Sequence, residues 1–258
     1  MKLTVLGGSA AGPNTGQGCS GYLISEDATR LVLDLGPGTL PELRKHTDFR
    51  TLDGIVVSHM HLDHVLDLLA LRFALAYNPI PAPMPIPLWL PPGGFDIFRR
   101  VGAAFASPGG ESTFFSPMFS INEYDPEGVV AIGTFSITFA QTVHPLPCWA
   151  MRVASSAAAR DLVYTADTGP AADLAGFGSG AAILLSEATL AHPRDEPPEG
   201  RGHMTAQEAG DLATRMGVET LVLTHMWEES GRDIAMREAK GGFTGSVHEA
   251  TPGLELSW

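Results

Sequence analysis

The sequence predicts an α/β fold in which two β-sheets pack face to face and helices cover their outer sides. Short apolar runs bounded by Gly, Ser and Asp alternate with helical segments along the chain. Each half of the chain runs from strands into helices, which favours layered sheets with helices outside. The 29 Gly and 20 Pro among 258 residues supply the tight turns that a sheet-rich fold needs. No linker interrupts this pattern, so we expect one domain over residues 1–258.

The strands are predicted from apolar runs that end at turn residues. They fall at Leu3–Leu6, Gly21–Ile24, Leu31–Leu35, Gly54–Ser58, Pro87–Leu90, Met118–Tyr124, Val129–Ala131, Phe135–Thr142, Ala150–Ala154, Asp161–Tyr164, Ala182–Leu185 and Leu221–Leu223. Stretches of good helix formers predict helices at Thr39–His46, His64–Tyr77, Phe95–Ala106, Ala171–Gly176, Thr205–Met216 and Arg232–Lys240. Thr205 is a good N-cap residue, and Glu208 three residues later completes a capping box.

Two loops are predicted around the middle of the chain. Five prolines occupy alternate positions from Pro79 to Pro87, which excludes a helix and disfavours a central strand. We therefore interpret this stretch as a loop that enters an edge strand at Pro87–Leu90. The second loop, Pro108–Pro117, is rich in Gly and Ser.

The composition indicates a globular protein without a membrane span. Hydrophobic residues make up 44% of the chain and charged residues 17%. No run approaches the roughly 18 apolar residues of a transmembrane helix, and the first residues resemble a strand more than a signal peptide. Cys19 and Cys148 are the only cysteines, which favours two reduced thiols but leaves one bridge open. We therefore expect a cytoplasmic protein.

The net charge of −13 limits the class of partner. Long nucleic acids are bound mainly by Lys and Arg that neutralise phosphates, and this chain has 16 such residues against 29 acidic ones. A large nucleic acid is therefore disfavoured as a partner. The balance favours a small anionic substrate.

The strongest chemical signal is a run of histidines directly after the strand Gly54–Ser58. His59, His61, Asp63 and His64 fall within six residues. Zinc is bound by imidazole and carboxylate groups in near-tetrahedral sets, and a catalytic zinc keeps one position for water. One ion cannot easily take four groups from so short a loop, so the spacing predicts two metal ions.

With this motif, His-x-His-x-Asp-His after a strand, the chain resembles the metallo-β-lactamase superfamily. That resemblance implies an αββα sandwich of two mixed sheets and extends to three later strand ends. Val143-His144-Pro145, Tyr164-Thr165-Ala166-Asp167 and Leu223-Thr224-His225 look like the later ligand motifs of the family. By that resemblance one zinc is held by His59, His61 and His144, and the other by Asp63, His64 and His225. Asp167 would bridge the two.

A carboxylate at position 167 indicates the type of chemistry. True β-lactamases of this fold place a cysteine there, whereas a bridging carboxylate can hold two cations about 3.5–4 Å apart, as in-line displacement at phosphorus requires. The histidine content favours two Zn²⁺ over magnesium, with Mn²⁺ or Fe²⁺ as an alternative at one site.

Two further segments resemble ribonuclease Z and its phosphodiesterase relatives. They are Ser186-Glu187-Ala188-Thr189-Leu190 and Arg201-Gly202-His203-Met204-Thr205. The resemblance implies that His203 protonates the leaving oxygen and that Glu187 orients its ring. Asp63 would orient the metal-activated hydroxide. A plain helix-entry role for His203 stays open.

The chain departs from ribonuclease Z between His144 and Asp167, because Asp167 follows His144 by only 23 positions, which leaves no room for the long arm that clasps tRNA. Together with the acidic balance, this favours a small phosphodiester such as a 3′,5′-cyclic nucleotide. The alternatives are a tRNA 3′-processing endonuclease, a hydrolase of lactones, thioesters or sulfate esters, and a catalytically silent zinc- or nucleotide-binding module. Relatives commonly pair, so a homodimer is also expected.

Overall fold

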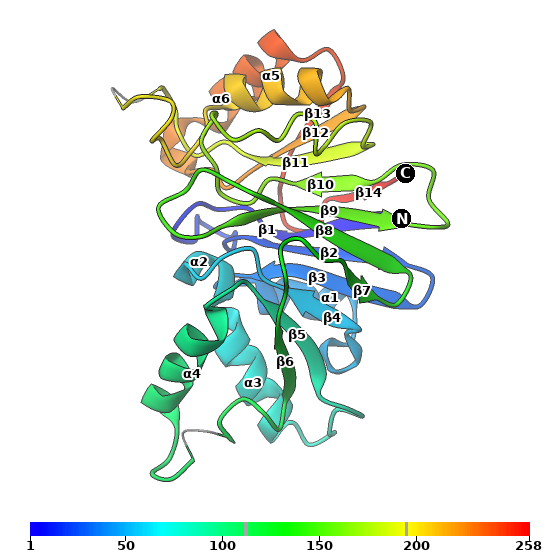
Figure 1. Ribbon diagram of the computed structural model, residues 1–258, viewed down its shortest axis with the longest axis vertical. Helices are drawn as coiled ribbons and strands as arrows, with labels where there is room; N and C mark the ends of the chain where they lie inside the picture. The colour runs from blue at the N-terminus through cyan, green and yellow to red at the C-terminus, as the bar shows by residue number, and fades with distance from the viewer. Residues whose placement is uncertain (111–112, 194–195) are drawn as a thin grey trace.

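The protein is a sandwich of two seven-stranded mixed sheets with helices on both outer sides, as the computed structural model shows (Figure 1). The structure describes residues 1–110, 113–193 and 196–258. In the first sheet the order is β14 (Glu255–Ser257), β1 (Lys2–Gly7), β2 (Gly21–Glu26), β3 (Thr29–Leu35), β4 (Gly54–Val56), β5 (Ile86–Leu90) and β6 (Phe119–Glu123). In the second sheet it is β13 (Ser246–Glu249), β12 (Thr220–Thr224), β11 (Ile183–Glu187), β10 (Leu162–Tyr164), β9 (Trp149–Ser155), β8 (Phe135–Gln141) and β7 (Val130–Ile132). The predicted fold class is confirmed.

The helices lie outside the two sheets and bury separate apolar clusters against them. The first sheet is accompanied by α1 (Thr39–His46), α2 (Leu62–Val65), α3 (Asp67–Tyr77) and α4 (Gly94–Phe105), with a 3₁₀ turn, η1, at Phe49–Thr51. The second sheet is covered by α5 (Ala206–Met216) and α6 (Arg232–Gly242), with a 3₁₀ turn, η3, at Glu228–Ser230. In Figure 1, α5 and α6 lie at one end of the molecule, and α3 and α4 lie at the other. None of the helices in the described part of the chain has the length and apolar run needed to cross a bilayer.

Between the sheets, inward-facing side chains of both form one apolar core. In β8 the inward residues alternate with half-exposed ones, as expected for a strand with one buried face. Tyr22 from the first sheet and Tyr164 from the second meet in this core with ring centroids 5.0 Å apart. The core therefore joins the two sheets directly beneath the loops described below.

Each sheet combines an antiparallel half with a parallel half. The strands from β3 to β6 run parallel to their neighbours, and so do those from β10 to β13. Parallel strands end at the same edge of a sheet, and ligand sites of α/β folds gather there. The loops that follow β4, β10 and β12 therefore leave from corresponding edges of the two sheets.

Some predicted elements differ from the structure. The predicted helix His64–Tyr77 begins earlier and is interrupted at Leu66, next to Asp67, whose Oδ2 accepts a hydrogen bond from the backbone N–H of Leu40 at 2.8 Å. The predicted edge strand Pro87–Leu90 is wrong in position, because β5 lies between β4 and β6. Pro87 is tolerated there because the register with β4 begins only at Leu88, so Pro87 has no partner on that side.

A predicted helix was wrong and two strands were missed. The segment Ala171–Gly176 forms turns, with short-range bonds such as Ala172 N–H to the Gly169 carbonyl. The strands β13 and β14 were missed because they are short and have little buried apolar surface, which is the signal that periodicity detects. The capping box of Thr205 and Glu208 is confirmed. Part of the predicted loop Pro108–Pro117, residues 111–112, lies outside the described residues.

Candidate metal centre

The seven side chains predicted to bind metal come together at the strand ends. Four of them lie on the segment 58–64, which follows β4 and which we call the metal loop. His144 follows β8, Asp167 follows β10, and His225 follows β12 directly. Residues far apart in the sequence therefore meet at one place. Their side chains form two clusters that share Asp167.

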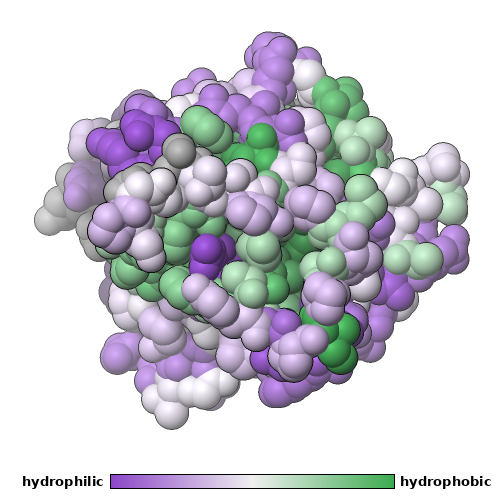
Figure 2. Space-filling view, turned by 90° about the horizontal axis from the view of Figure 1, so that it is seen from below, coloured by the Kyte–Doolittle hydropathy of each residue, from purple (hydrophilic) through white to green (hydrophobic). Residues whose placement is uncertain are grey.

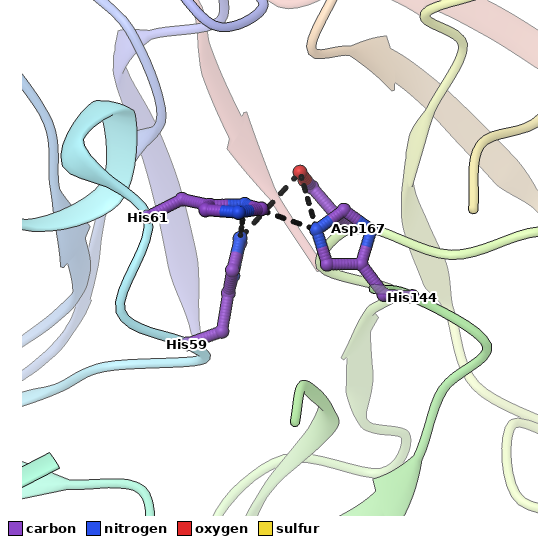
Figure 3. Close-up of side chains that lie close together, drawn as sticks. All are labelled: His59, His61, His144 and Asp167. Atoms are coloured by element: carbon purple, nitrogen blue, oxygen red, sulfur yellow. Dashed lines mark hydrogen bonds and ion pairs between the residues drawn. The ribbon is translucent and has the colours of Figure 1, made fainter. Parts of the chain in front are cut away.

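The three-histidine cluster consists of His59, His61 and His144 with Asp167. His59 Nε2 and His144 Nε2 each lie 3.0 Å from His61 Nδ1. Asp167 Oδ2 lies 3.6 Å from His59 Nε2 and 3.8 Å from His144 Nε2. Figure 3 shows the four side chains pointing toward a common centre.

The two-histidine cluster consists of Asp63, His64 and His225 with Asp167. Asp63 Oδ2 lies 2.9 Å from His225 Nε2 and 3.4 Å from His64 Nε2. Asp167 reaches both imidazoles, with 3.3 Å from Oδ1 to His64 Nε2 and 3.5 Å from Oδ2 to His225 Nε2. All four residues are buried.

The donor atoms fit a bound divalent metal. A tetrahedral zinc site with Zn–N distances of about 2.0–2.1 Å has ligand atoms about 3.3–3.4 Å apart, close to the spacings in both clusters. His64 Nε2 and Asp167 Oδ1 are buried and have no hydrogen-bond partner within the described residues. Such atoms are costly to bury unless another group satisfies them, and a cation would satisfy both.

On the metal-loop side, hydrogen bonds at the outer nitrogens aim the rings inward. His64 Nδ1 donates to Asp34 Oδ2 at 2.7 Å. His59 Nδ1 lies 3.0 Å from Ser58 Oγ, and this hydroxyl donates to Asp34 Oδ2 at 2.8 Å. With Nδ1 protonated in both rings, each Nε2 carries the lone pair that a metal binds. Asp34 therefore sets the tautomer of two imidazoles.

On the other side, two more rings are held in the same way. His144 Nδ1 donates to the Gly202 carbonyl at 3.0 Å. His225 Nδ1 lies 2.7 Å from Thr189 Oγ1, which in turn donates to Glu187 Oε2 at 2.8 Å. Both rings therefore also present Nε2 to the centre. His61 differs, because it presents Nδ1.

The electrostatics of the two clusters differ. Burial lowers the pKa of all three imidazoles in the three-histidine cluster, so they are neutral and ready to bind a cation. Burial also opposes charge on His64, but the carboxylates of Asp167 and Asp34 outweigh it and raise its pKa well above the usual value. For Asp63, hydrogen bonds from His225 and His64 outweigh burial and hold its pKa below the ordinary range.

Three residues at the site have left-handed backbone conformations. Asp34, Ala166 and His225 have φ of 54°, 52° and 53°. Asp34 lies where the register of β3 with β2 shifts, which turns its side chain toward the metal loop. Such strained residues persist only where the surrounding structure holds them, and they gather at functional sites.

Sequence reasoning did not identify Asp34 as a site residue. This fully buried carboxylate accepts four hydrogen bonds, from the Ser58 N–H and hydroxyl, the His64 ring and the Tyr164 hydroxyl. Tyr164 belongs to the second sheet, so Asp34 also links the two sheets beneath the metal loop. A signal in the sequence was the single carboxylate within the apolar strand Leu31–Leu35.

Beside the clusters, Glu187 and His203 form a hydrogen-bonded pair. His203 Nδ1 donates to Glu187 Oε1 at 2.9 Å. Glu187 is fully buried and also accepts bonds from the backbone N–H groups of Thr168 and Met204. The His203 side chain is 27% exposed, and its ring stacks at 5.6 Å on that of His225. A half-exposed imidazole thus stands at the mouth of the site.

The two cysteines are both free and buried. Cys19 and Cys148 therefore form no bridge, in agreement with the favoured prediction. Cys148 Sγ donates to the backbone carbonyl of Asp167 at 3.4 Å, so one thiol contacts the backbone of the residue that the two clusters share.

The chain is similar to several known proteins over nearly its whole length. The protein-family model described as "Beta-lactamase superfamily domain" matches residues 29–226 of the chain. "Uncharacterized protein ML1173" of Mycobacterium leprae (strain TN) is 34% identical over 256 residues, which cover 98% of this chain and 87% of that protein. "Probable metallo-hydrolase YhfI" of Bacillus subtilis (strain 168) is 30% identical over 256 residues, 98% of each chain. Ribonuclease Z of Haloarcula marismortui is 25% identical over 308 residues, 99% of this chain and 96% of that protein.

Solved structures show the same architecture. The crystal structure of the metallo-beta-lactamase fold protein YhfI from Bacillus subtilis matches with a TM-score of 0.86 and 28% identity over 99% of each chain. The short form of human tRNase Z matches with a TM-score of 0.75 at 20% identity, over 100% of this chain and 99% of that one. A diphosphatase from the PhnP family matches with a TM-score of 0.71 at 18% identity, over 100% and 97%. The last two similarities concern the fold alone.

Proposed function

The chain belongs to the beta-lactamase superfamily and is a metallo-hydrolase, and from this premise we propose that it hydrolyses small phosphodiesters at a pair of zinc ions. The proposed substrates are 3′,5′-cyclic nucleotides. One observation carries the proposal: two ligand clusters share the carboxylate of Asp167, and the His203–Glu187 pair stands beside them. Two adjacent cations clamp the attacking and leaving oxygens of a displacement at phosphorus. Two of the similar proteins, the ribonuclease Z and the diphosphatase of the PhnP family, carry names of enzymes that cleave bonds to phosphorus.

The proposed metal ligands are the seven residues of the two clusters. His59, His61 and His144 would hold one ion, Asp63, His64 and His225 the other, and Asp167 both. When bound, the two ions would lower the pKa of a shared water and offset the charge that develops on the phosphate. We propose Zn²⁺ for both, with Mn²⁺ or Fe²⁺ as an alternative at one site.

The protein side chains would align the reactants and move the proton. Asp63 is held ionised, so it can accept a hydrogen bond from the attacking water and orient it. His203 Nδ1 donates a hydrogen bond to Glu187. Nε2 is therefore the atom from which the protonated ring would deliver a proton to the departing oxygen. Glu187 keeps the ring in this orientation.

A small substrate is favoured by the segment between His144 and Asp167. It contains only a turn, β9, a second turn and β10, and β9 and β10 pair directly with each other. The segment therefore forms no arm that could extend over a bound polymer. With the net charge of −13, this supports a compact, singly charged diester over a transfer RNA.

Metal content and substrate choice test the proposal on one purified sample. We expect two metal ions per chain and hydrolysis of cyclic AMP and of bis-(4-nitrophenyl) phosphate. Faster cleavage of a precursor tRNA or of a lactone would assign one of the alternative activities instead. Two bound metals with no hydrolysis of any of these would indicate a silent binding module.

The general-acid role is tested by His203→Ala. We expect unchanged metal content and a turnover of cyclic AMP lower by roughly 10²–10⁴, as is typical for loss of a general acid. His192→Ala is the matched control, since this exposed histidine lies on the same stretch of chain and outside both clusters. Equal turnover in the His203 variant would remove the assignment.

We also propose that the protein forms a homodimer through an apolar stripe on α2 and α3. The stripe consists of Leu62 on α2, Leu66 between the two helices, and Phe73 and Tyr77 on α3, which are 64%, 37%, 40% and 73% exposed. Figure 2 shows hydrophobic side chains among polar ones on the end of the molecule formed by α3 and α4. Exposed apolar patches are typical of interaction sites, and within the stripe the rings of Phe73 and Tyr77 stack with centroids 5.7 Å apart. Sedimentation of wild type and Phe73→Asp checks this, because a monomeric wild type would refute it. The cytoplasmic location stays a prediction.

A further inference from the structure

The segment Arg201–Thr205 contacts the site at three points although it belongs to no helix or strand. The Gly202 carbonyl orients the His144 ring, and His203 Nδ1 donates to Glu187. The Met204 N–H donates to the other oxygen of Glu187 at 3.2 Å. The position of this one segment therefore affects both the three-histidine cluster and the His203–Glu187 pair.

The five residues before the segment, 196–200, are all exposed. Arg201 is the first buried residue, with 3% of its surface exposed. Its Nη2 is paired with the carboxylate of Glu208 in the first turn of α5. The same carboxylate accepts bonds from the Thr205 N–H at 2.9 Å and the Thr205 hydroxyl at 3.1 Å. Both ends of the segment are therefore fastened to Glu208.

The backbone of Arg201 is also tightly packed. A Cβ placed on Gly169 would overlap the Arg201 carbonyl oxygen, so the segment lies directly against the residues that follow Asp167. The backbone of Arg201 therefore has no free space on that side.

Stability alone does not account for a buried guanidinium at this position. Arg201 Nε has no hydrogen-bond partner within the described residues. A buried ion pair whose donors are not all satisfied is often no better for stability than an apolar side chain of similar size. What the ion pair does supply is a directional anchor at the start of a segment without regular structure.

We propose that Arg201 is a positioning residue, whose ion pair with Glu208 places His203 for proton delivery. The inference rests on the proposed function, because it assigns Arg201 a role through the proposed general acid. Errors of about 1 Å in the placement of a reacting group can lower turnover roughly 10²-fold. Loss of the anchor therefore affects proton delivery while the seven proposed ligands are all retained.

The test compares Arg201→Met with wild type on two diesters that differ in leaving group. Met fills similar space, and the Glu208 side chain is 26% exposed, so it can be hydrated when its partner is lost. Turnover of cyclic AMP, whose leaving alkoxide needs a proton, should fall about 10–100-fold. Turnover of bis-(4-nitrophenyl) phosphate, whose leaving phenolate needs none, should fall less than about threefold.

Matched variants separate positioning from general damage. Glu208→Gln keeps the capping box but removes the charge of the pair, so it should reproduce the Arg201 effect. Arg152→Met breaks an ion pair with Asp161 between β9 and β10 and should leave both rates unchanged. In a His203→Ala background, Arg201→Met should cause no further loss. Equal losses on both diesters, or a further loss in that background, would overturn the proposal.

A measurement without substrate distinguishes this inference from the proposed function. In NMR spectra of ¹⁵N-histidine protein, Arg201→Met should shift the ring signals of His203 and leave those of His46 unchanged. If wild type cleaves neither diester, the proposed function fails. In that case, shifted ring signals would still support Arg201 as the anchor of the segment, and unchanged signals would overturn it.

Discussion

Replacement of Asp34 by asparagine should weaken metal binding although residue 34 is not one of the proposed ligands. Asp34 Oδ1 accepts a hydrogen bond from the backbone N–H of Ser58 at 2.7 Å. This N–H group can only donate, so it needs an acceptor at that position. The new side-chain amide must therefore keep its oxygen there and turn its NH₂ group toward His64 Nδ1, which in the wild type lies 2.7 Å from a carboxylate oxygen. His64 Nδ1 would have to accept a hydrogen bond, so its proton would move to Nε2 and block the atom that faces the two-histidine cluster.

The magnitude follows from the role of such supporting carboxylates. Loss of an outer partner of a metal ligand lowers metal affinity about 10–100-fold, or about 1.4–2.7 kcal/mol. We expect this loss at the two-histidine cluster. The three-histidine cluster should change less, because the Ser58 hydroxyl stands between Asp34 and His59 and can rotate.

The assay is zinc titration of metal-free protein against a competing fluorescent chelator, with the two binding steps fitted separately. Tyr164→Phe is the control, because it removes one donor to Asp34 and leaves the carboxylate and the His64 tautomer in place. Two binding steps at wild-type affinity in Asp34→Asn would refute the reasoning.

Three other predictions concern pH, thiol reactivity and close packing. His64 has a raised pKa in the metal-free protein, so a proton competes with the cation there as the pH falls. The imidazoles of the three-histidine cluster have lowered pKa values and therefore stay neutral to lower pH. Dialysis at stepwise lower pH should therefore release metal from the two-histidine cluster first, and simultaneous loss of both metals would contradict this. Burial raises the pKa of the Cys19 thiol to about 12 and that of Cys148 further still. Native protein at pH 8 should therefore resist alkylation by iodoacetamide, whereas unfolded protein should take up two equivalents. Mass spectrometry of the treated protein measures this. In Gly36→Ala, the new Cβ would overlap the backbone of the metal loop, so the melting temperature and the metal content should both fall. Gly176→Ala is the control, because a Cβ at Gly176 would meet open space. Wild-type melting temperature and metal content in Gly36→Ala would contradict this prediction, because the loop could then move aside.

The layered fold was predictable because its signals are local. Apolar runs such as Leu31–Leu35 end at glycines, and the capping box at Thr205 marks the start of α5 from two residues alone. Where the signal depends on partners, prediction failed: β5 was expected at a sheet edge because of Pro87, but β4 and β6 both pair with it. The position of a strand within a sheet is decided by contacts that no window of sequence contains.

The same division holds for the site. The spacing of His59, His61 and His64 with Asp63 pointed to metal ligands on the metal loop, because such a cluster is rare by chance. The resemblance to the family added the three later ligands, and the structure brings all seven side chains together. Only the tertiary structure showed what holds these rings in place. Asp34 lies 24 residues before the metal loop and Arg201 is fastened to Glu208 through the start of α5, so neither role follows from a motif. Ligand type is set by the chemistry of each residue, whereas tautomer, ring direction and proton placement are set by hydrogen bonds between distant segments, and these exist only once the two sheets have packed.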